Sequence, residues 1–149
     1  MSVGTLCNRE VVVTDKDTSI AEAAELMRKY HVGDLVVLDD GDGRRPIGLI
    51  TDRDIAVGIV AKGLDPDTLS VADVMTGDLE TVFEDADFWD ALAHMRRHGV
   101  RRLPVVNDAG GLEGILTLDD ALSLISEAMN DLVDLVYREV DREKSLRKV

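Results

Sequence analysis

The sequence predicts an α+β fold in which two β-α-β-β-α repeats pack sheet to sheet about a pseudo-twofold axis, followed by a C-terminal helix. Three observations support this prediction: an internal repeat, an alternation of β-rich runs with helical periodicity inside each copy, and an aliphatic composition. Hydrophobic residues make up 45% of the 149 residues, whereas aromatic residues make up only 3%. We therefore expect one module whose core is built from Val, Leu, Ile and Ala.

The internal repeat is the most informative feature of the chain. At an offset of 68 residues Val3 aligns with Val71, and after a two-residue deletion the offset becomes 66 and Gly48 aligns with Gly114. Further matched pairs are Asp17 and Asp85, Ala23 and Ala91, Met27 and Met95, Val37 and Val105, and Ile59 and Ile125. We expect the chain to divide into repeat 1 at 3–62, a linker at 63–70, repeat 2 at 71–126 and a helical tail at 127–149.

Each copy is predicted to run strand, helix, strand, strand, helix. In repeat 1, residues 11–14 form a β-rich run, Ser19 and Glu22 have capping-box spacing before a helix, and residues 35–50 indicate a hairpin. A second helix opens at Thr51 and runs past Ile55 and Ile59. Repeat 2 follows the same order, with strands at 79–82, 103–106 and 112–116 and helices at 88–95 and from 118 onward. Neither copy could bury both faces of a three-stranded sheet alone, so we expect one folding unit.

The charge of the chain excludes several functions. Its 17 Lys and Arg residues against 30 Asp and Glu residues give a net charge of -13 at pH 7. Binding to nucleic acid needs a basic face and docking on an anionic membrane needs clustered Lys and Arg, so we expect neither partner. No apolar run approaches the ~20 residues of a membrane helix, and the N-terminus lacks the layout of a signal peptide. Since the single Cys7 cannot form an internal disulfide, we expect a cytoplasmic protein.

One motif occurs in both copies and carries the candidate chemistry. It consists of a glycine, two apolar residues, a threonine and, three residues later, an aspartate, at Gly48–Asp54 and at Gly114–Asp120. The pattern predicts a buried strand that ends in a threonine and opens a helix. A helix N-terminus attracts phosphate through its free N–H groups and its dipole, and a carboxylate can accept hydrogen bonds from both hydroxyls of a ribose. These parts suit a nucleotide.

The same motif is also close to an ordinary capping box. In that interpretation Thr51 and Asp54, or Thr117 and Asp120, only close the first turn of a helix. Either copy alone favours this simpler interpretation, whereas its occurrence at equivalent positions of a repeat favours a ligand site.

The repeat resembles a tandem pair of CBS domains, together a Bateman module, over roughly residues 3 to 126. The resemblance rests on Val74-Met75-Thr76, on the run from Val100 to Val106 and on both copies of the Gly-h-h-Thr-x-x-Asp motif, where h is apolar. It implies the α/β-type CBS fold, a homodimer, and two clefts that take adenosine-containing ligands, with AMP, ADP or ATP as the leading candidates. By the resemblance, Asp54 and Asp120 would hold the ribose, and Thr51 and Thr117 would approach the phosphates.

The two copies differ at positions whose side chains could neutralise the phosphate charge of a ligand. Repeat 2 has Arg101-Arg102 where repeat 1 has Gly33-Asp34, and by analogy these arginines could face phosphates near the centre of the module. An ordinary surface role explains the two arginines about equally well. Arg53 is a further candidate phosphate contact, with an exposed helix position as its alternative. Since Asp34 would repel a phosphate, we expect the two clefts to differ in affinity or in ligand.

No catalytic constellation emerges from the sequence, so we predict no catalytic residue and do not expect an enzyme. His94 and His98 have i, i+4 spacing on one helix face, but no Glu or third ligand follows the zinc pattern, and neither they nor His31 are expected to bind a metal. We expect no required cofactor. Bound ATP would benefit from Mg²⁺, because the chain is strongly acidic.

The tail from Glu127 to Val149 has apolar residues at helical spacing, so the last repeat helix either continues or restarts there. It packs on its own module or binds a partner. Our leading hypothesis is a regulatory module that binds an adenine nucleotide and signals, through dimer geometry or the tail, to an unidentified regulated protein. The alternative is a structural dimer whose C-terminal helix docks a partner protein without nucleotide control.

Overall fold

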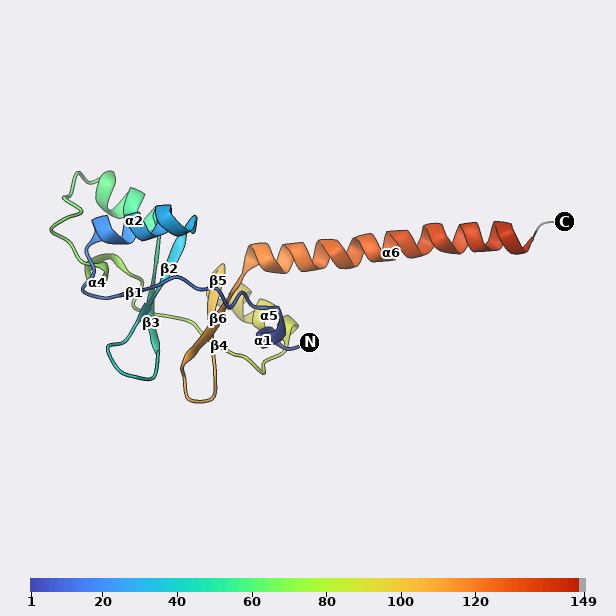
Figure 1. The fold of residues 1–149 in the computed structure, drawn as a ribbon, viewed down its shortest axis with the longest axis horizontal. Coiled ribbons are helices and arrows are strands. Elements are labelled where there is room, and N and C mark those ends of the chain that lie inside the picture. The colour runs from blue at the N-terminus through green and yellow to red at the C-terminus, as the bar shows by residue number, and fades with distance from the viewer. Residues whose placement is uncertain (148–149) are drawn as a thin grey trace. The chain divides into compact units, whose positions relative to one another are not determined.

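Two three-stranded sheets, one per repeat, form the frame of this computed structural model, which describes residues 1–147 (Figure 1). Their orders are β1-β2-β3 and β4-β5-β6. The strands are Val13–Asp15, Asp34–Leu38, Pro46–Thr51, Val82–Phe83, Arg102–Val106 and Leu112–Thr117. In each sheet the first strand pairs in parallel with the second, and β2 pairs antiparallel with β3. The α+β prediction of two equivalent repeats is confirmed.

The parallel pairs need crossover helices, and these are α2 (Ile20–Tyr30) and α5 (Phe88–His98). Ser19 begins α2 with the predicted capping box, in which its hydroxyl accepts from the Glu22 N–H at 3.1 Å. Helix α5 ends at Gly99, whose φ of 65° is the left-handed conformation that glycine adopts without strain.

The helices that follow the third strand differ between the repeats. In repeat 1, α3 (Asp52–Ile55) passes into a π-helix, η1 (Ala56–Val60), in which the Ala61 N–H donates to the Ala56 carbonyl at 2.9 Å. The sequence predicted one helix from Thr51 past Ile59, and the wider turn accounts for the difference. In repeat 2, α6 (Leu118–Leu146) is a single helix of 29 residues, so the tail continues the last repeat helix.

Two four-residue helices open the repeats, and the sequence did not predict them. They are α1 (Val3–Leu6) and α4 (Val71–Val74). Each bonds to the other repeat: the Val3 N–H donates to Ala86 O at 2.9 Å, and the Val71 N–H donates to Thr18 O at 2.8 Å. The repeats therefore exchange their opening helices.

The core of repeat 1 lies between its sheet and its helices. Its fully buried members include Ile20 of α2, Leu35 of β2 and Ile50 of β3. A second cluster joins the two repeats, because Val36 of β2 packs with Leu112 and Ile115 of β6. This contact is the predicted packing of sheet on sheet, and burial of each such aliphatic side chain is worth about 1.5–3 kcal/mol.

The chain divides into two units, Met1–Leu116 and a second that begins at Thr117. The first unit holds both sheets up to Leu116 of β6, and the second contains α6. Within residues 1–147, no helix is both long and apolar enough to cross a membrane.

Candidate functional site

A cleft in the first unit lies among three segments that come from both repeats. They are the end of β3 with the start of α3, the segment at 76–80 before β4, and the turn at 100–102 before β5. The lining residues are Leu49, Thr51, Asp54, Thr76, Asp78, Leu79, Glu80, Val100, Arg101 and Arg102. The structure thus brings four predicted site residues, Thr51, Asp54, Arg101 and Arg102, to one cleft.

Thr51 and Asp54 are positioned by a capping box at the start of α3. The Thr51 hydroxyl accepts from the Asp54 N–H at 3.1 Å, and Asp54 Oδ2 accepts from the Thr51 N–H at 2.9 Å. The simpler interpretation of the motif is therefore correct as far as it goes. The cap bonds only to Asp54 Oδ2. It therefore fixes the position of the carboxylate in the cleft wall and leaves Oδ1 to accept from other donors.

Gly48 in the same motif has a separate role. The Thr76 N–H donates to the Leu49 carbonyl at 3.0 Å, which brings the segment before β4 against β3. A Cβ on Gly48 would lie 2.7 Å from Met75 Sδ and 3.0 Å from the Thr76 carbonyl oxygen. The glycine therefore permits this close approach, and the approach builds one wall of the cleft.

The two arginines of the cleft are held differently. Arg102 Nε donates to Asp34 Oδ2 at 2.6 Å, and the two side chains are 33% and 20% exposed. Asp34 is the repeat-1 counterpart of Arg102, so the acid that we expected to repel a phosphate instead pairs with this arginine across the pseudo-twofold. Arg101 is exposed at the edge of the cleft, where its guanidinium can meet an anion.

The cleft also contains residues that sequence reasoning did not single out. Leu49 and Val100 give it apolar walls, and Asp78 and Glu80 add carboxylates. The Val74-Met75-Thr76 motif was the available signal for this segment, but nothing in the local pattern showed that residues 76–80 would lie beside Asp54. That proximity arises only because the segment pairs with β3 of the other repeat.

The remaining predicted residues lie elsewhere. Arg53 is exposed, and it is not among the residues that line the cleft. Thr117 and Asp120 belong to the second unit, where they form the same capping box at the start of α6. In that box the Asp120 N–H donates to the Thr117 hydroxyl at 3.1 Å, and this hydroxyl donates to Asp120 Oδ2 at 2.6 Å.

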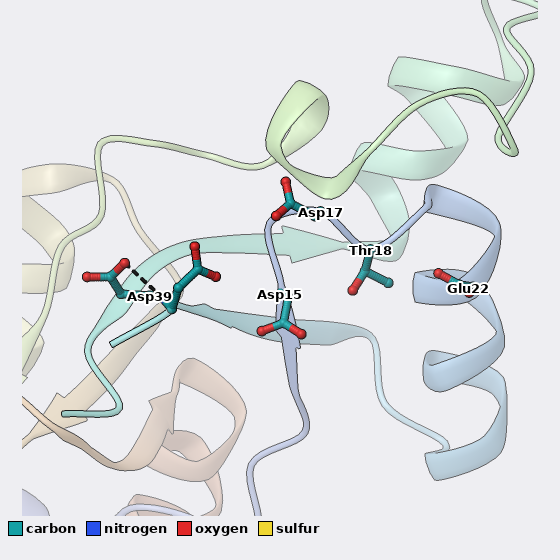
Figure 2. Close-up of a pocket in the computed structure, with 6 residues that line it drawn as sticks. Asp15, Asp17, Thr18, Glu22 and Asp39 are labelled. Carbon is teal, nitrogen blue, oxygen red and sulfur yellow. Dashed lines mark hydrogen bonds between the residues drawn. The ribbon is translucent and has the colours of Figure 1, made fainter. Parts of the chain in front are cut away.

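A second hollow lies at the end of β1 and the start of α2 (Figure 2). Its lining is almost entirely acidic: Asp15, Asp17, Thr18, Glu22, Asp39 and Asp40. Lys16 bonds to Asp40 at 3.0 Å, and this hydrogen bond raises the pKa of Lys16. Because five carboxylates would repel a phosphate, this hollow does not suit a nucleotide.

Comparison with known proteins gives consistent matches. The CBS domain family matches residues 3–61 and 71–127. An uncharacterized protein of Methanopyrus kandleri, MK0525, is 36% identical over 124 residues, which are 83% of this chain and 62% of that protein. This chain thus spans less than two thirds of that relative.

Two solved structures have the same fold. Hypoxic Response Protein I, solved with two coordinated zinc ions, is 31% identical with a TM-score of 0.71, covering 83% of this chain and 98% of that one. The CBS domain protein PAE2072 from Pyrobaculum aerophilum, complexed with AMP, is 30% identical with a TM-score of 0.73, covering 80% of this chain and 89% of that one. The chain belongs to the CBS domain family and carries two copies of the domain.

Proposed function

We propose that this protein is a non-catalytic regulatory module that binds an adenosine-containing ligand, with AMP, ADP and ATP as the first candidates. The observation that carries the proposal is the convergence of Thr51, Asp54 and Arg101, from both repeats, on one cleft. The AMP complex of the 30% identical PAE2072 supports the ligand class. The free thiol of Cys7 suits a protein that acts in the reducing cytoplasm.

Each part of such a ligand has a complementary group in the cleft. The adenine base would lie against Leu49 and Val100, and the ribose hydroxyls would donate to Asp54 Oδ1. The phosphate would approach Thr51 and the exposed Arg101. The cleft encloses about 200 Å³, less than the ~300–1,000 Å³ of typical ligand pockets, so the phosphate end of the ligand would project towards solvent.

The charges of the cleft set the order of preference among the nucleotides. Asp54, Asp78 and Glu80 are acidic, and Arg102 is already paired with Asp34. Only Arg101 then remains to balance added phosphates, so each further phosphate costs Coulomb energy. We propose that AMP binds without metal and that ATP needs Mg²⁺ to offset its charge.

Thr117 and Asp120 are the repeat-2 counterparts of Thr51 and Asp54, and Arg53 has the acidic Asp119 as its counterpart. We propose that Thr117 and Asp120 bind a second ligand, and bind it more weakly. Arg53 stays a candidate phosphate contact only for a ligand that extends beyond the residues lining the first cleft.

A thermal-shift panel with AMP, ADP, ATP, NAD and S-adenosylmethionine tests the ligand class. A ligand present at 100 times its Kd should stabilise the protein by about 2.7 kcal/mol. Asp54→Asn keeps an oxygen for the cap but removes the charge, and it should weaken AMP binding about tenfold or more. Arg97→Ala, on the last turn of α5 and outside the cleft lining, is the matched control for Arg101→Ala.

Two results would overturn this proposal. One is the absence of any shift with the whole panel at millimolar concentration. The other is an AMP response that survives both Asp54→Asn and Arg101→Ala unchanged.

A second candidate function rests on α6, whose apolar side chains are exposed along most of its length. They are Leu122, Met129, Leu132, Val133, Leu135, Val136, Tyr137, Val140 and Leu146. We propose that this face pairs with a second copy of the chain and that the homodimer passes ligand binding to a regulated protein. Coupling requires that the ligand bind two conformations with different affinity.

Removal of residues 127–149 separates the two functions. We expect the shortened chain to sediment as a monomer and to keep its AMP response, because the cleft lies in the first unit. The alternative function predicts a different result. The full chain would bind its partner protein equally well with and without AMP, and removal of the tail would abolish that binding.

A further inference from the structure

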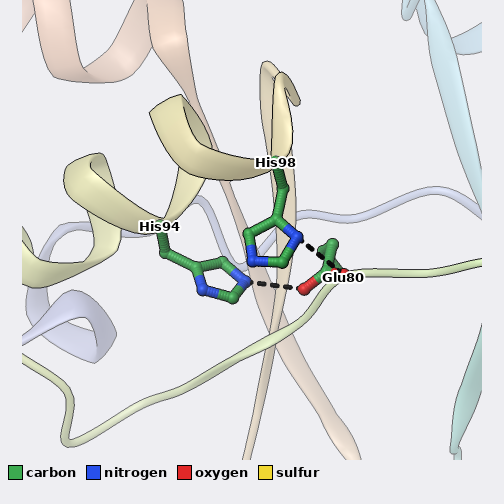
Figure 3. A group of neighbouring side chains, drawn as sticks. All are labelled: Glu80, His94 and His98. Atoms are coloured by element: carbon green, nitrogen blue, oxygen red, sulfur yellow. Dashed lines mark hydrogen bonds and ion pairs between the residues drawn. The ribbon is translucent and has the colours of Figure 1, made fainter.

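We propose that Glu80, His94 and His98 form a binding site for a divalent transition-metal ion of the zinc class. His94 and His98 lie one turn apart on α5, and both imidazoles face the carboxylate of Glu80, which comes from the segment before β4 (Figure 3). The sequence predicted no metal here because its spacing gave no third ligand. The fold supplies that ligand from 14 residues upstream of His94.

The three side chains already meet at close range. His94 Nε2 lies 2.7 Å from Glu80 Oε2, and His98 Nδ1 lies 3.1 Å from Glu80 Oε1. One ligand atom from each residue lies within 4.8 Å of the other two. Zinc bonds of ~2.0–2.2 Å at tetrahedral angles place ligand atoms roughly 3.3–3.6 Å apart, so small side-chain rotations would seat an ion.

The chemistry of the ligand set selects the metal. Imidazole nitrogens suit zinc and its transition-metal neighbours, whereas Mg²⁺ and Ca²⁺ prefer an all-oxygen shell. Two imidazoles and one carboxylate leave the fourth tetrahedral position for water or for a donor atom of a ligand. The side chains are 26%, 41% and 28% exposed for His94, His98 and Glu80, so an ion can reach them.

Comparison of the two repeats argues against a merely structural cluster. The repeat-1 counterparts of Glu80, His94 and His98 are Val12, Leu26 and Tyr30. Val12 and Leu26 pack against the apolar core of their repeat. Since the fold accepts two aliphatic side chains and a tyrosine at these three positions in one copy, it does not require a carboxylate and two imidazoles in the other.

The site also adjoins the proposed nucleotide cleft, because Glu80 lines that cleft. A bound ion would neutralise one of the three acids of the cleft wall. The metal site itself does not depend on the proposed nucleotide function, because its three ligands do not include Thr51, Asp54 or Arg101.

The test uses the untagged chain, stripped with a chelator, dialysed, and then loaded with zinc alone. We expect one zinc ion per chain by elemental analysis, a rise in Tm on loading, and a visible tetrahedral d–d spectrum when Co²⁺ replaces zinc. His94→Gln should weaken zinc binding about tenfold or more, since even loss of a group behind a ligand costs ~10–100-fold.

Matched variants complete the experiment. The triple variant Glu80→Val/His94→Leu/His98→Tyr carries the residues of repeat 1, and it should keep the fold and lose the ion. His31→Asn removes the remaining histidine at a left-handed position (φ 54°) that Asn tolerates, and it should bind zinc like the parent chain. Asp54→Asn should also retain zinc even where it loses AMP.

Equal zinc retention by the parent and triple variants overturns the proposal, as does a parent chain that retains no zinc after dialysis. If the triple variant fails to fold, His94→Gln alone gives the same decision from its zinc affinity.

Discussion

Gly48 of repeat 1 and Gly114 of repeat 2 occupy the same point of their strands, and each faces the segment that opens the other repeat. Gly48 lies against Met75 and Thr76, and Gly114 lies against Cys7 and Asn8, their sequence counterparts. The threonine–aspartate caps that follow share both backbone hydrogen bonds of the capping box, and the cap of repeat 2 adds a bond from the Thr117 hydroxyl to Asp120 Oδ2. At these positions the two repeats are physically equivalent.

The repeats differ at positions where side chains would contact the proposed nucleotide or the proposed metal ion. Arg101 and Arg102 replace Gly33 and Asp34, and a carboxylate and two imidazoles replace Val12, Leu26 and Tyr30. The comparison shows that the glycines and the threonine–aspartate caps are duplicated, whereas the two arginines and the three proposed metal ligands are not. The second repeat therefore carries most of the chemical specialisation.

The largest expected effect comes from filling the two glycine positions. A Cβ on Gly114 would lie 2.6 Å from Cys7 Sγ and 2.8 Å from the Asn8 carbonyl oxygen, both short or fixed groups. On Gly48 the nearest atom is the flexible Met75 Sδ, at 2.7 Å. Urea unfolding should show a loss of about 2–3 kcal/mol for Gly114→Ala and roughly 1 kcal/mol for Gly48→Ala.

Gly41→Ala is the control for this pair, because a Cβ there would meet nothing within 4 Å. Equal losses of unfolding free energy for Gly48→Ala and Gly114→Ala would mean that the two close backbone approaches are equally rigid as well as geometrically equivalent.

A smaller effect is expected from the ion pair that links the repeats. Arg102 and Asp34 are partly buried and bonded at 2.6 Å, so Asp34→Asn should cost about 1–2 kcal/mol of unfolding free energy. The same variant frees Arg102 and should tighten AMP binding. A double-mutant cycle with Arg102→Ala measures the coupling, and a coupling energy near zero would show that the pair is solvent-screened.

Cys7 should react slowly for a thiol. Burial raises the pKa of Cys7 above its ordinary value of 9.0, so less of the reactive thiolate is present at pH 7.5. Alkylation should be several-fold slower than in the urea-unfolded chain and should accelerate with a midpoint above pH 9. Met75→Cys in a Cys7→Ser background places a thiol at the repeat-2 counterpart, and a much faster rate there would break the equivalence.

The smallest effect concerns the caps of the crossover helices, where Asp87 in repeat 2 replaces Ser19 in repeat 1. The N-terminal ammonium of Met1, at 3.1 Å, and the Trp89 N–H lower the pKa of Asp87. Its contribution to stability is therefore present above its ordinary pKa of 3.8 and is lost as pH falls through the lowered value.

A carbon-detected NMR titration should place the Asp87 midpoint below 3.8, and acetylation of the N-terminus should raise it. Asp87→Ser restores the residue of repeat 1 and should remove this step from the acid-unfolding profile of α5. A midpoint at or above the ordinary value would contradict the contact.

The sequence predicted the parts of the fold that rest on repeated local pattern. The strands of the two hairpins and the α2 cap at Ser19 follow from periodicity and capping chemistry, whereas the strand predicted at 79–82 forms only at Val82–Phe83. The helices α1 and α4 have four residues each, too few to show helical periodicity, and so they were missed. The π-turn after Ile55 depends on packing that no local pattern records.

For the candidate site, the sequence identified Thr51 and Asp54 through the duplicated motif. It identified Arg101 and Arg102 because repeat 1 has a glycine and an aspartate at the equivalent positions. It did not show that Asp34 would pair with Arg102, because charge counted along a chain does not reveal which residues meet across an axis. Glu80 was missed for the same reason, since its histidine partners lie on another element.

The exchange of α1 and α4 between the repeats has a consequence for how the chain holds together. Each half carries a piece that completes the other, so contacts outside the linker at 63–70 also hold the two halves together. A single proteolytic nick there should leave the two fragments bound and co-eluting. Either fragment made alone would lack its complement, so the pair should recover its fold only when both halves are mixed.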